Sequence, residues 1–349
     1  MKKIKLCFIG AGFNGQIGFI ENFSKNKNCE IFGIAEFRKK LREKVCKRYK
    51  VENRYSSHKE LEKDISKYDG VVIVTKRNMM PAITYELLKY GKPILTEKPM
   101  AMSLVQSSKL LSRSKKYSTL YKVGYNKIYD DGIIDAKKKF DKLVKSKSLG
   151  KIVLVRSHRL SGSGYDKKNK YLKTSEKNFL SKPCWSSKPD WLPKRYSKSY
   201  EKYLNLYCHN VSLLRYFTNE IPNVERAMLS DNSMSIVNLK YKNFNAILET
   251  GFFTKKGWDE TLEIYFEFGS LLIKLPPQHH KNKSASFKIV KNFKEKNFTS
   301  RMKKTWSFKN QCDAFIKDIQ NEKIHINKAQ ESIKDIGLIE KIWKKHLNL

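Results

Sequence analysis

A glycine pattern near the start of the chain constrains the fold more than any other feature. Gly10, Gly12 and Gly15 form a G-x-G-x-x-G directly after an apolar run that begins at Ile4. Dinucleotide-binding loops lie between an apolar strand and a helix, and here the apolar run precedes the glycines and a segment compatible with a helix follows them. The first glycine permits the tight turn, the second lets the backbone approach a pyrophosphate, and the third lets the helix pack on the strand. The alternative interpretation is a glycine turn in an α/β domain that binds no phosphate.

The end of the next apolar run predicts which dinucleotide binds. The predicted strand 30–35 is apolar after Glu30 and ends at Glu36, which lies 21 residues beyond Gly15. An acidic side chain at this point binds the ribose hydroxyls of the adenosine, and it would repel a 2′-phosphate. We therefore predict NAD as the cofactor. Arg38, two residues later, leaves NADP open, because an arginine here can accommodate that phosphate.

Residues 1–124 alternate between short apolar runs and segments with helical spacing. Strands are expected at residues 5–9, 30–35, 71–75, 93–95 and 120–123, and helices are expected to begin near residues 15, 38, 59, 81 and 103. This rhythm predicts an α/β domain with a parallel sheet and right-handed crossovers, which is a Rossmann domain when it carries the glycine loop.

The pattern changes after residue 124. A predicted helix at 132–146 and a predicted strand at 151–158 precede a long polar segment, 161–203. Closely spaced strands are then expected at 224–229, 235–241, 244–253, 261–266 and 269–275, followed by helices at 308–320 and 328–346. We predict two domains, a dinucleotide-binding domain at 1–124 and an α+β domain with a mostly antiparallel open sheet at 125–349.

The net charge of +38 raises the question of a nucleic-acid partner. However, 60 of the 72 basic residues are lysines, and they are spread over the whole chain. Nucleic-acid readers rely on arginine and cluster their basic residues, so we expect no nucleic-acid partner but some attraction for anionic ligands. No apolar run approaches the ~20 residues that span a bilayer, so we expect no membrane partner. Six cysteines without a C-x-x-C pair indicate reduced thiols in a cytoplasmic protein and predict no metal site.

A short motif after the predicted strand 93–95 carries candidate chemistry. Glu97, Lys98 and Pro99 follow this strand, so Lys98 is expected at the carboxyl end of the parallel sheet. Ligands of open α/β sheets bind at that edge. A cis peptide bond before Pro99 would hold the turn that aims the lysine. Taken alone, such a tripeptide is usually a surface turn.

With these motifs in place, the chain resembles the Gfo/Idh/MocA family, which includes glucose-fructose oxidoreductase and inositol dehydrogenase. The resemblance covers nearly the whole chain, and it rests on residues 9–15, Glu36, residues 91–93 leading to 96–99, residues 123–126 and residues 149–152. It implies a Rossmann domain followed by a second domain whose open antiparallel sheet forms one wall of the substrate site. That sheet is often an oligomer interface in the family, so a homo-oligomer is expected.

The resemblance also implies catalytic residues. Relatives usually carry an aspartate four residues before a histidine, and the matching positions here are Asn205 and His209. Positions i and i+4 share one helix face, but an asparagine cannot accept a proton as a carboxylate does. His158 is a weaker candidate with a structural role expected, and Tyr207 and Tyr125 are reserve proton donors.

The activity implied is hydride transfer between nicotinamide and a hydroxyl-bearing carbon of a sugar, sugar nucleotide or cyclitol, including anionic ones. Lys98, His209 and Asn205 are expected to be the catalytic residues. The residues expected to hold the cofactor are Gly10, Gly12, Phe13, Asn14, Gly15, Glu36, Arg38, Thr75, Glu97 and Lys98. Two alternatives stay open. One is a sensor that binds NAD and a sugar-like ligand without turnover, and the other is a glycosidase that uses NAD for transient oxidation.

Overall fold

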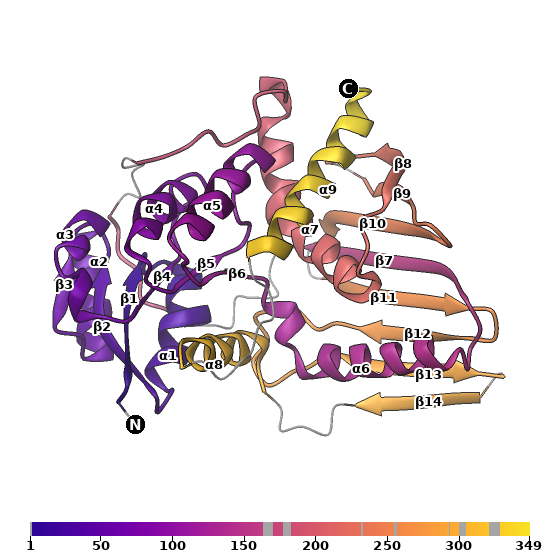
Figure 1. The fold of residues 1–349 in the computed structure, drawn as a ribbon, viewed down its shortest axis with the longest axis horizontal. Helices are drawn as coiled ribbons and strands as arrows, with labels where there is room; N and C mark the ends of the chain where they lie inside the picture. The colour runs from indigo at the N-terminus through magenta and orange to yellow at the C-terminus, as the bar shows by residue number, and fades with distance from the viewer. Residues whose placement is uncertain are drawn as a thin grey trace. The chain divides into compact units, whose positions relative to one another are not determined.

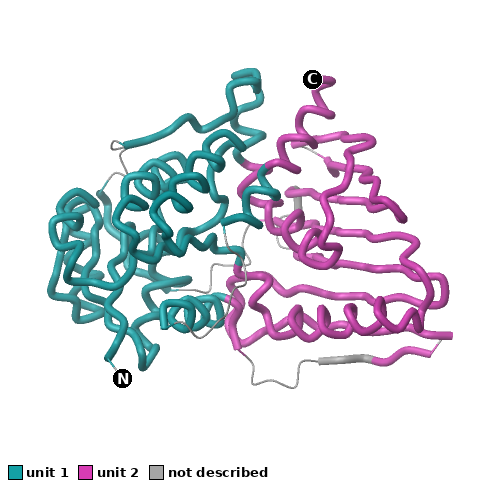
Figure 2. Tube along the Cα trace, in the orientation of Figure 1, with its two compact units in different colours: residues 1–125, 170–201, 308–336 teal, residues 126–169, 202–307, 337–349 magenta. Residues whose placement is uncertain are grey.

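The chain divides into two compact units, shown in different colours in Figure 2. Unit 1 comprises Met1–Tyr125, Lys170–Glu201 and Phe308–Ile336, and unit 2 comprises Asn126–Asn169, Lys202–Ser307 and Gly337–Leu349. The computed structural model describes residues 2–162, 170–176, 183–231, 233–254, 257–292, 294–299, 305–320 and 329–349. Each unit combines separate segments of the chain, whereas the predicted domains 1–124 and 125–349 are continuous. The division into those two domains stays a prediction.

Unit 1 contains a six-stranded parallel sheet with the strand order β3-β2-β1-β4-β5-β6 (Figure 1). Its strands are β1 (Ile4–Ile9), β2 (Cys29–Ala35), β3 (Asn53–Tyr55), β4 (Gly70–Ile73), β5 (Ile94–Glu97) and β6 (Tyr121–Gly124). The predicted parallel α/β sheet is therefore confirmed. β3 was not predicted, because three residues at a sheet edge are too few to show a hydrophobic period.

Helices connect these strands. They are the π-helical η1 (Gly15–Ile20), α1 (Glu21–Ser24), α2 (Lys39–Tyr49), α3 (His58–Glu62), η2 (Ile65–Lys67), α4 (Met80–Leu87), η3 (Leu88–Tyr90) and α5 (Leu104–Lys116). All five predicted helix starts lie within one residue of an observed helix. The continuous apolar run of β4 is entirely buried, as expected for the centre of a parallel sheet.

A helix from late in the chain packs on the N-terminal sheet. The aromatic ring of Phe308, in α8 (Ser307–Ile319), lies 5.9 Å from that of Phe19 and against Gly18, where a Cβ would come within 2.9 Å of the ring. Lys122 of β6 forms a buried ion pair with Asp318 of α8. The helix was predicted as residues 308–320, but nothing in its own sequence indicated where it packs.

Unit 2 contains an eight-stranded sheet with the order β14-β13-β12-β11-β7-β10-β9-β8. Its strands are β7 (Ile152–Gly162), β8 (Asn223–Met228), β9 (Ser235–Lys240), β10 (Asn245–Thr254), β11 (Trp258–Phe266), β12 (Gly269–Lys274), β13 (Ser286–Lys291) and β14 (Lys294–Thr299). Every pairing is antiparallel except the parallel pairing of β7 with β10, which confirms the mostly antiparallel second sheet. β13 and β14 were not predicted, because lysines interrupt their apolar alternation.

The two faces of this sheet differ in chemistry. Val155, Leu248 and Leu262 are buried on one face, and α6 (Asp131–Ser146) runs along β12 and β13 (Figure 1). Strand alternation puts Arg156 and Glu249 on the other face, where they form an ion pair of 2.7 Å. The remaining elements are η4 (Asn126–Tyr129), η5 (Lys194–Tyr196), α7 (Ser197–Thr218) and α9 (Ala329–Leu347). α7 takes up the end of the predicted long loop 161–203, whose residues 163–169 and 177–182 lie outside the described residues.

Candidate functional site

The glycine loop has the geometry that a dinucleotide needs. Gly10 has a φ of +95°, and a Cβ on it would lie 2.2 Å from the carbonyl oxygen of Val74. A Cβ on Gly15 would lie 2.5 Å from the carbonyl oxygen of Gly10. Over Gly12, by contrast, the nearest atom to such a Cβ is Nη2 of Arg38 at 3.9 Å. The loop is therefore tightly closed at its two ends and open at the glycine where a pyrophosphate approaches.

Glu36 lies at the end of β2, next to this loop. Its carboxylate is buried, and Oε2 accepts a hydrogen bond of 2.9 Å from the amide of Ala11. The guanidinium of Arg38 donates to both carboxylate oxygens, at 2.8 Å and 2.9 Å. The hydrogen bond to Glu36 raises the pKa of Arg38 above its ordinary value. Arg38 thus neutralises the carboxylate that would otherwise repel a 2′-phosphate, and a preference for NAD over NADP stays a prediction.

Lys98 follows β5 at the carboxyl edge of the parallel sheet, as predicted. The Lys98–Pro99 peptide bond is cis, which confirms the expected cis proline. Glu97 accepts hydrogen bonds from the amide of Lys98 and, at 3.3 Å, from Nδ2 of Asn14. Desolvation raises the pKa of the Glu97 carboxyl, and Lys98 is only 8% exposed. Loop residue Asn14 and the Glu97–Lys98 motif therefore meet at one edge of the sheet.

Thr75 follows the end of β4 and completes this edge. Its Cγ2 would lie 3.1 Å from a Cβ on Gly10, so its side chain packs on the glycine loop. Phe13 lies in the loop between Gly12 and Asn14. All the residues predicted to hold the cofactor therefore lie in unit 1, on the loop or at neighbouring strand ends. Their individual roles stay predictions.

Asn205 and His209 lie in unit 2, on the continuous helix α7. Their spacing puts them on one face of the helix, His209 is buried, and Asn205 is half-buried. Lys98 belongs to unit 1, so a catalytic group formed by these three residues stays a prediction.

A buried charged group surrounds this part of α7, and the sequence did not indicate it. Glu260 of β11 is fully buried, forms an ion pair with Lys127, and accepts a hydrogen bond of 3.2 Å from Asn210. Arg159 of β7 donates to the carbonyl oxygen of Leu206 in α7. These contacts fix α7 against the sheet next to His209. They join four separate parts of the chain, so a local sequence pattern could not predict these contacts.

The weaker candidates have clear structural surroundings. His158 lies between two carboxylates, with Nδ1 2.8 Å from Glu249 and Nε2 3.5 Å from Asp259. Tyr207 is buried, and desolvation raises its pKa to about 12, so its hydroxyl gives up a proton less readily than usual. Tyr125 is also buried. The roles of both tyrosines as reserve proton donors stay predictions.

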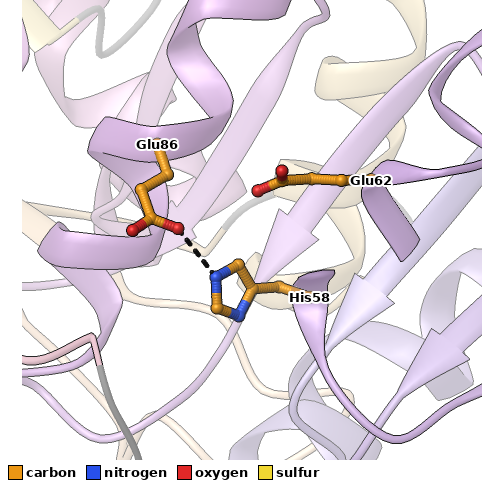
Figure 3. A group of neighbouring side chains, drawn as sticks. All are labelled: His58, Glu62 and Glu86. Carbon is orange, nitrogen blue, oxygen red and sulfur yellow. Dashed lines mark hydrogen bonds and ion pairs between the residues drawn. The ribbon is translucent and has the colours of Figure 1, made fainter. Parts of the chain in front are cut away.

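One group of potential metal ligands lies away from the glycine loop (Figure 3). The ligand atoms of His58, Glu62 and Glu86 lie within 4.8 Å of one another. Protein groups already contact them, because Nε2 of His58 is 2.9 Å from Glu86 and the ammonium of Lys59 contacts both glutamates. Tyr90 also donates to Glu62. The group is explained as a network of ion pairs, and we assign no metal to it.

Comparisons with known proteins agree with this geometry, which is that of a dinucleotide-binding oxidoreductase. Residues 4–125 match the model of the oxidoreductase family with an NAD-binding Rossmann fold, Gfo/Idh/MocA. The match confirms the resemblance over these residues and describes them as an NAD-binding Rossmann fold, while the choice between NAD and NADP stays a prediction. No curated protein matches the chain.

Solved structures share the fold along the whole chain. An aldose-aldose oxidoreductase from Caulobacter crescentus, complexed with glycerol, has a TM-score of 0.79 at 16% identity, covering 99% of this chain and 98% of that one. A dehydrogenase from Clostridium difficile has a TM-score of 0.72 at 20% identity over 98% and 99%. An oxidoreductase from Agrobacterium radiobacter, in complex with NAD+, L-tartaric acid and magnesium, has a TM-score of 0.72 at 15% identity over 99% and 97%. Identities this low establish the fold alone.

The hydropathy of the helices and the state of the cysteines are two further features of the structure. In the part of the chain that the structure describes, no helix is both long and apolar enough to cross a membrane. All six cysteines are free thiols, and all but Cys184 are buried.

Proposed function

We propose that the protein is an NAD(P)-dependent oxidoreductase that transfers a hydride between nicotinamide and a hydroxyl-bearing carbon of a sugar, sugar nucleotide or cyclitol. The observation that carries the proposal is the common sheet edge of unit 1. The open glycine loop, Glu36 at the end of β2 and the buried Lys98 after β5 all lie there. A bound dinucleotide supplies the hydride chemistry, and the protein supplies orientation and a path for the proton.

Each proposed catalytic residue has a separate role. Lys98 binds the reacting hydroxyl and takes its proton, because it follows β5 at the sheet edge where ligands of such domains bind, and a positioned amine can act as a general base. His209 relays this proton. Asn205 orients the imidazole or a substrate hydroxyl by hydrogen bonding, since its amide cannot take up the proton itself.

Two further observations support a polyhydroxylated or anionic substrate. The related structures contain glycerol or tartaric acid, which carry several hydroxyl or carboxylate groups. The net charge of +38 also favours the approach of anionic ligands. A cytoplasmic homo-oligomer that associates through the sheet of unit 2 completes the proposal.

A sensor that binds NAD and a sugar-like ligand without turnover is the second candidate. Asn205 is the observation that favours it, because it removes the carboxylate that relatives place before the histidine. A screen of sugars, sugar nucleotides and cyclitols, followed at the absorbance of reduced nicotinamide, separates the two. Binding of NADH without oxidation or reduction of any compound would favour the sensor.

The sharpest test of the catalytic role is Lys98→Ala. We expect kcat to fall by roughly 10² to 10⁴, the usual effect of losing an acid-base group, while the Kd for NADH changes by less than about twofold. The affinity is retained because the loop, and not the lysine, holds the pyrophosphate. Lys109→Ala, on the exposed face of α5, is the matched control. An unchanged kcat in Lys98→Ala would rule out the role.

A further inference from the structure

Residues 170–176, here called the strap, lie against the glycine loop although they follow it by more than 150 residues. Figure 2 colours them with unit 1, whereas β7, the last strand before them in the chain, is coloured with unit 2. The side chain of Gln16, in the first turn of η1, makes two hydrogen bonds to the backbone of Leu172. Nε2 donates to the carbonyl oxygen at 3.0 Å, and the amide of Leu172 donates to Oε1 at 2.9 Å. Gln16 is only 1% exposed and also donates to the carbonyl oxygen of Ala11, so it ties the strap to the loop itself.

An aromatic contact holds the strap on the loop. The ring of Tyr171 meets the ring of Phe13 edge-to-face, with centroids 5.0 Å apart. Phe13 lies directly after Gly12, the residue at which the loop is open to a pyrophosphate. The ammonium of Lys173 lies 4.8 Å from the centroid of the Tyr171 ring. The strap therefore brings an aromatic ring and a cation next to the loop.

The other end of the strap is anchored on α2. The carboxylate of Glu176 accepts hydrogen bonds from the amides of Lys40 at 2.9 Å and Leu41 at 3.0 Å. These amides belong to the first turn of α2, where a carboxylate is favoured by the helix dipole. Thr174 donates a further hydrogen bond to the same carboxylate. Glu36, the expected partner of the adenosine ribose, lies just before this turn.

The two anchors enclose a definite part of the dinucleotide site. In a Rossmann domain the pyrophosphate lies at the glycine loop, and the adenosine ribose lies at the acidic residue that ends the second strand. The strap is attached at both places, to Phe13 and Gln16 at one end and to α2 at the other. Arg38, between them, lies near enough to Glu176 to interact with its charge.

We propose that the strap is part of the cofactor site, and that it covers the adenosine half of the bound dinucleotide and slows its release. The proposal rests on NAD binding by unit 1. In this proposal the strap, which lies far from the glycine loop in the sequence, helps to bind the adenosine diphosphate part of the dinucleotide. Because dissociation requires the strap to detach, its contacts act mainly on the release rate and less on the association rate.

The test compares release rates, which do not depend on turnover. The double variant Tyr171→Ala/Glu176→Ala removes the ring contact with Phe13 and the anchor on α2, leaving the Gln16 hydrogen bonds in place, and we expect NADH to dissociate at least about tenfold faster when it is displaced by excess NAD. ADP-ribose should show a similar change, because it carries the half that the strap covers. Ser175→Ala, on an exposed residue of the same segment, is the matched control. Tyr171→Phe keeps the ring contact and should release NADH as the unaltered protein does.

Hydrogen exchange of residues 170–176 gives an independent readout. NAD and ADP-ribose should slow exchange of the Leu172 amide, whereas nicotinamide mononucleotide should not. Unchanged release in the double variant would overturn the proposal, and so would tighter binding, which would show that the strap competes with the dinucleotide. If the unaltered protein binds neither NADH nor ADP-ribose, it is the proposed function that fails.

Discussion

At the scale of single residues, the pairing of Glu36 with Arg38 is the feature that bears most on cofactor choice. The sequence indicated both residues but not that they are bonded to each other. In the structure the guanidinium binds both carboxylate oxygens, and the amide of Ala11 binds one of them as well. A paired carboxylate repels a 2′-phosphate less than a free one does, and Arg38 is itself a cation that can attract the phosphate.

Replacing Arg38 should therefore sharpen the preference for NAD. In Arg38→Ala the carboxylate of Glu36 loses its partner, and we expect the ratio of the Kd for NADPH to the Kd for NADH to rise by about tenfold or more. Fluorescence titration of the unaltered protein and the variant with both reduced cofactors measures this ratio. Arg48→Ala, a substitution at an exposed position near the end of α2, serves as the control. A ratio that stays the same or falls would contradict the prediction.

At the scale of elements, two buried polar contacts join helices to the rest of their unit. Asp130 caps α6 by accepting hydrogen bonds from the amide of Gly132 at 2.9 Å and that of Ala285 at 2.8 Å. Desolvation raises its pKa to about 6, although these amide hydrogen bonds act in the opposite direction. Lys122 and Asp318 join β6 to α8 through an ion pair in which both side chains are at most 2% exposed.

The raised pKa of Asp130 makes stability depend on pH. The folded protein binds this proton more tightly than the unfolded chain, so the contribution to stability is present below about pH 4 and is lost as the pH rises through about 6. Asp130→Asn removes the titration but keeps an acceptor oxygen for the cap. We expect the free energy of unfolding of the unaltered protein, minus that of the variant, to fall by up to about 3 kcal/mol between pH 4 and pH 7. Urea unfolding of both proteins across this range measures the difference, and a constant difference would refute the assignment.

The ion pair between Lys122 and Asp318 should show strong coupling. Removing one partner leaves a buried charge, so Lys122→Met and Asp318→Leu should each lower the free energy of unfolding by about 3–5 kcal/mol. The double variant buries no charge and should be more stable than either single variant. Urea unfolding of the unaltered protein, the two single variants and the double variant gives a double-mutant cycle that measures the coupling energy. If the two single effects simply add, the ion pair does not have the role described here.

At the scale of the whole molecule, the excess of positive charge opposes compaction. The net charge of +38 comes mainly from lysines spread over the entire chain. Such a distribution raises solubility but destabilises the compact state through self-repulsion. Added salt shortens the range of this repulsion from about 30 Å at 0.01 M to about 3 Å at 1 M.

Stability should therefore rise with sodium chloride. We expect the Tm to increase by a few degrees or more between 0.01 M and 1 M, since about 1 kcal/mol corresponds to roughly 2–4 °C for a chain of this order of size. Sorbitol at the same osmolarity controls for effects unrelated to charge. A Tm that is unchanged or lower in salt would show that local ion pairs outweigh the overall repulsion.

Local sequence patterns determined the elements and much of the candidate site of this protein. The apolar runs, their spacing and the glycines at positions 10, 12 and 15 were sufficient to predict the parallel sheet, most of its helices and the open loop. The position of Lys98 also followed from the sequence, because a residue that comes directly after a buried strand must lie at the sheet edge. These features depend on neighbours within a few residues, where backbone geometry translates spacing directly into structure.

The tertiary structure alone decided which distant segments meet. Gln16 and Leu172 form two hydrogen bonds, Lys127 forms an ion pair with Glu260, and Lys122 forms one with Asp318. The local sequence around these residues does not indicate which distant residue each of them contacts. The lysine-rich β13 and β14 were missed for a related reason, since pairing with β12 places them in the sheet. Such contacts form because a polar group that folding buries needs a hydrogen-bond or ion-pair partner. That partner can come from any part of the chain, so only the tertiary structure decides which residue it is.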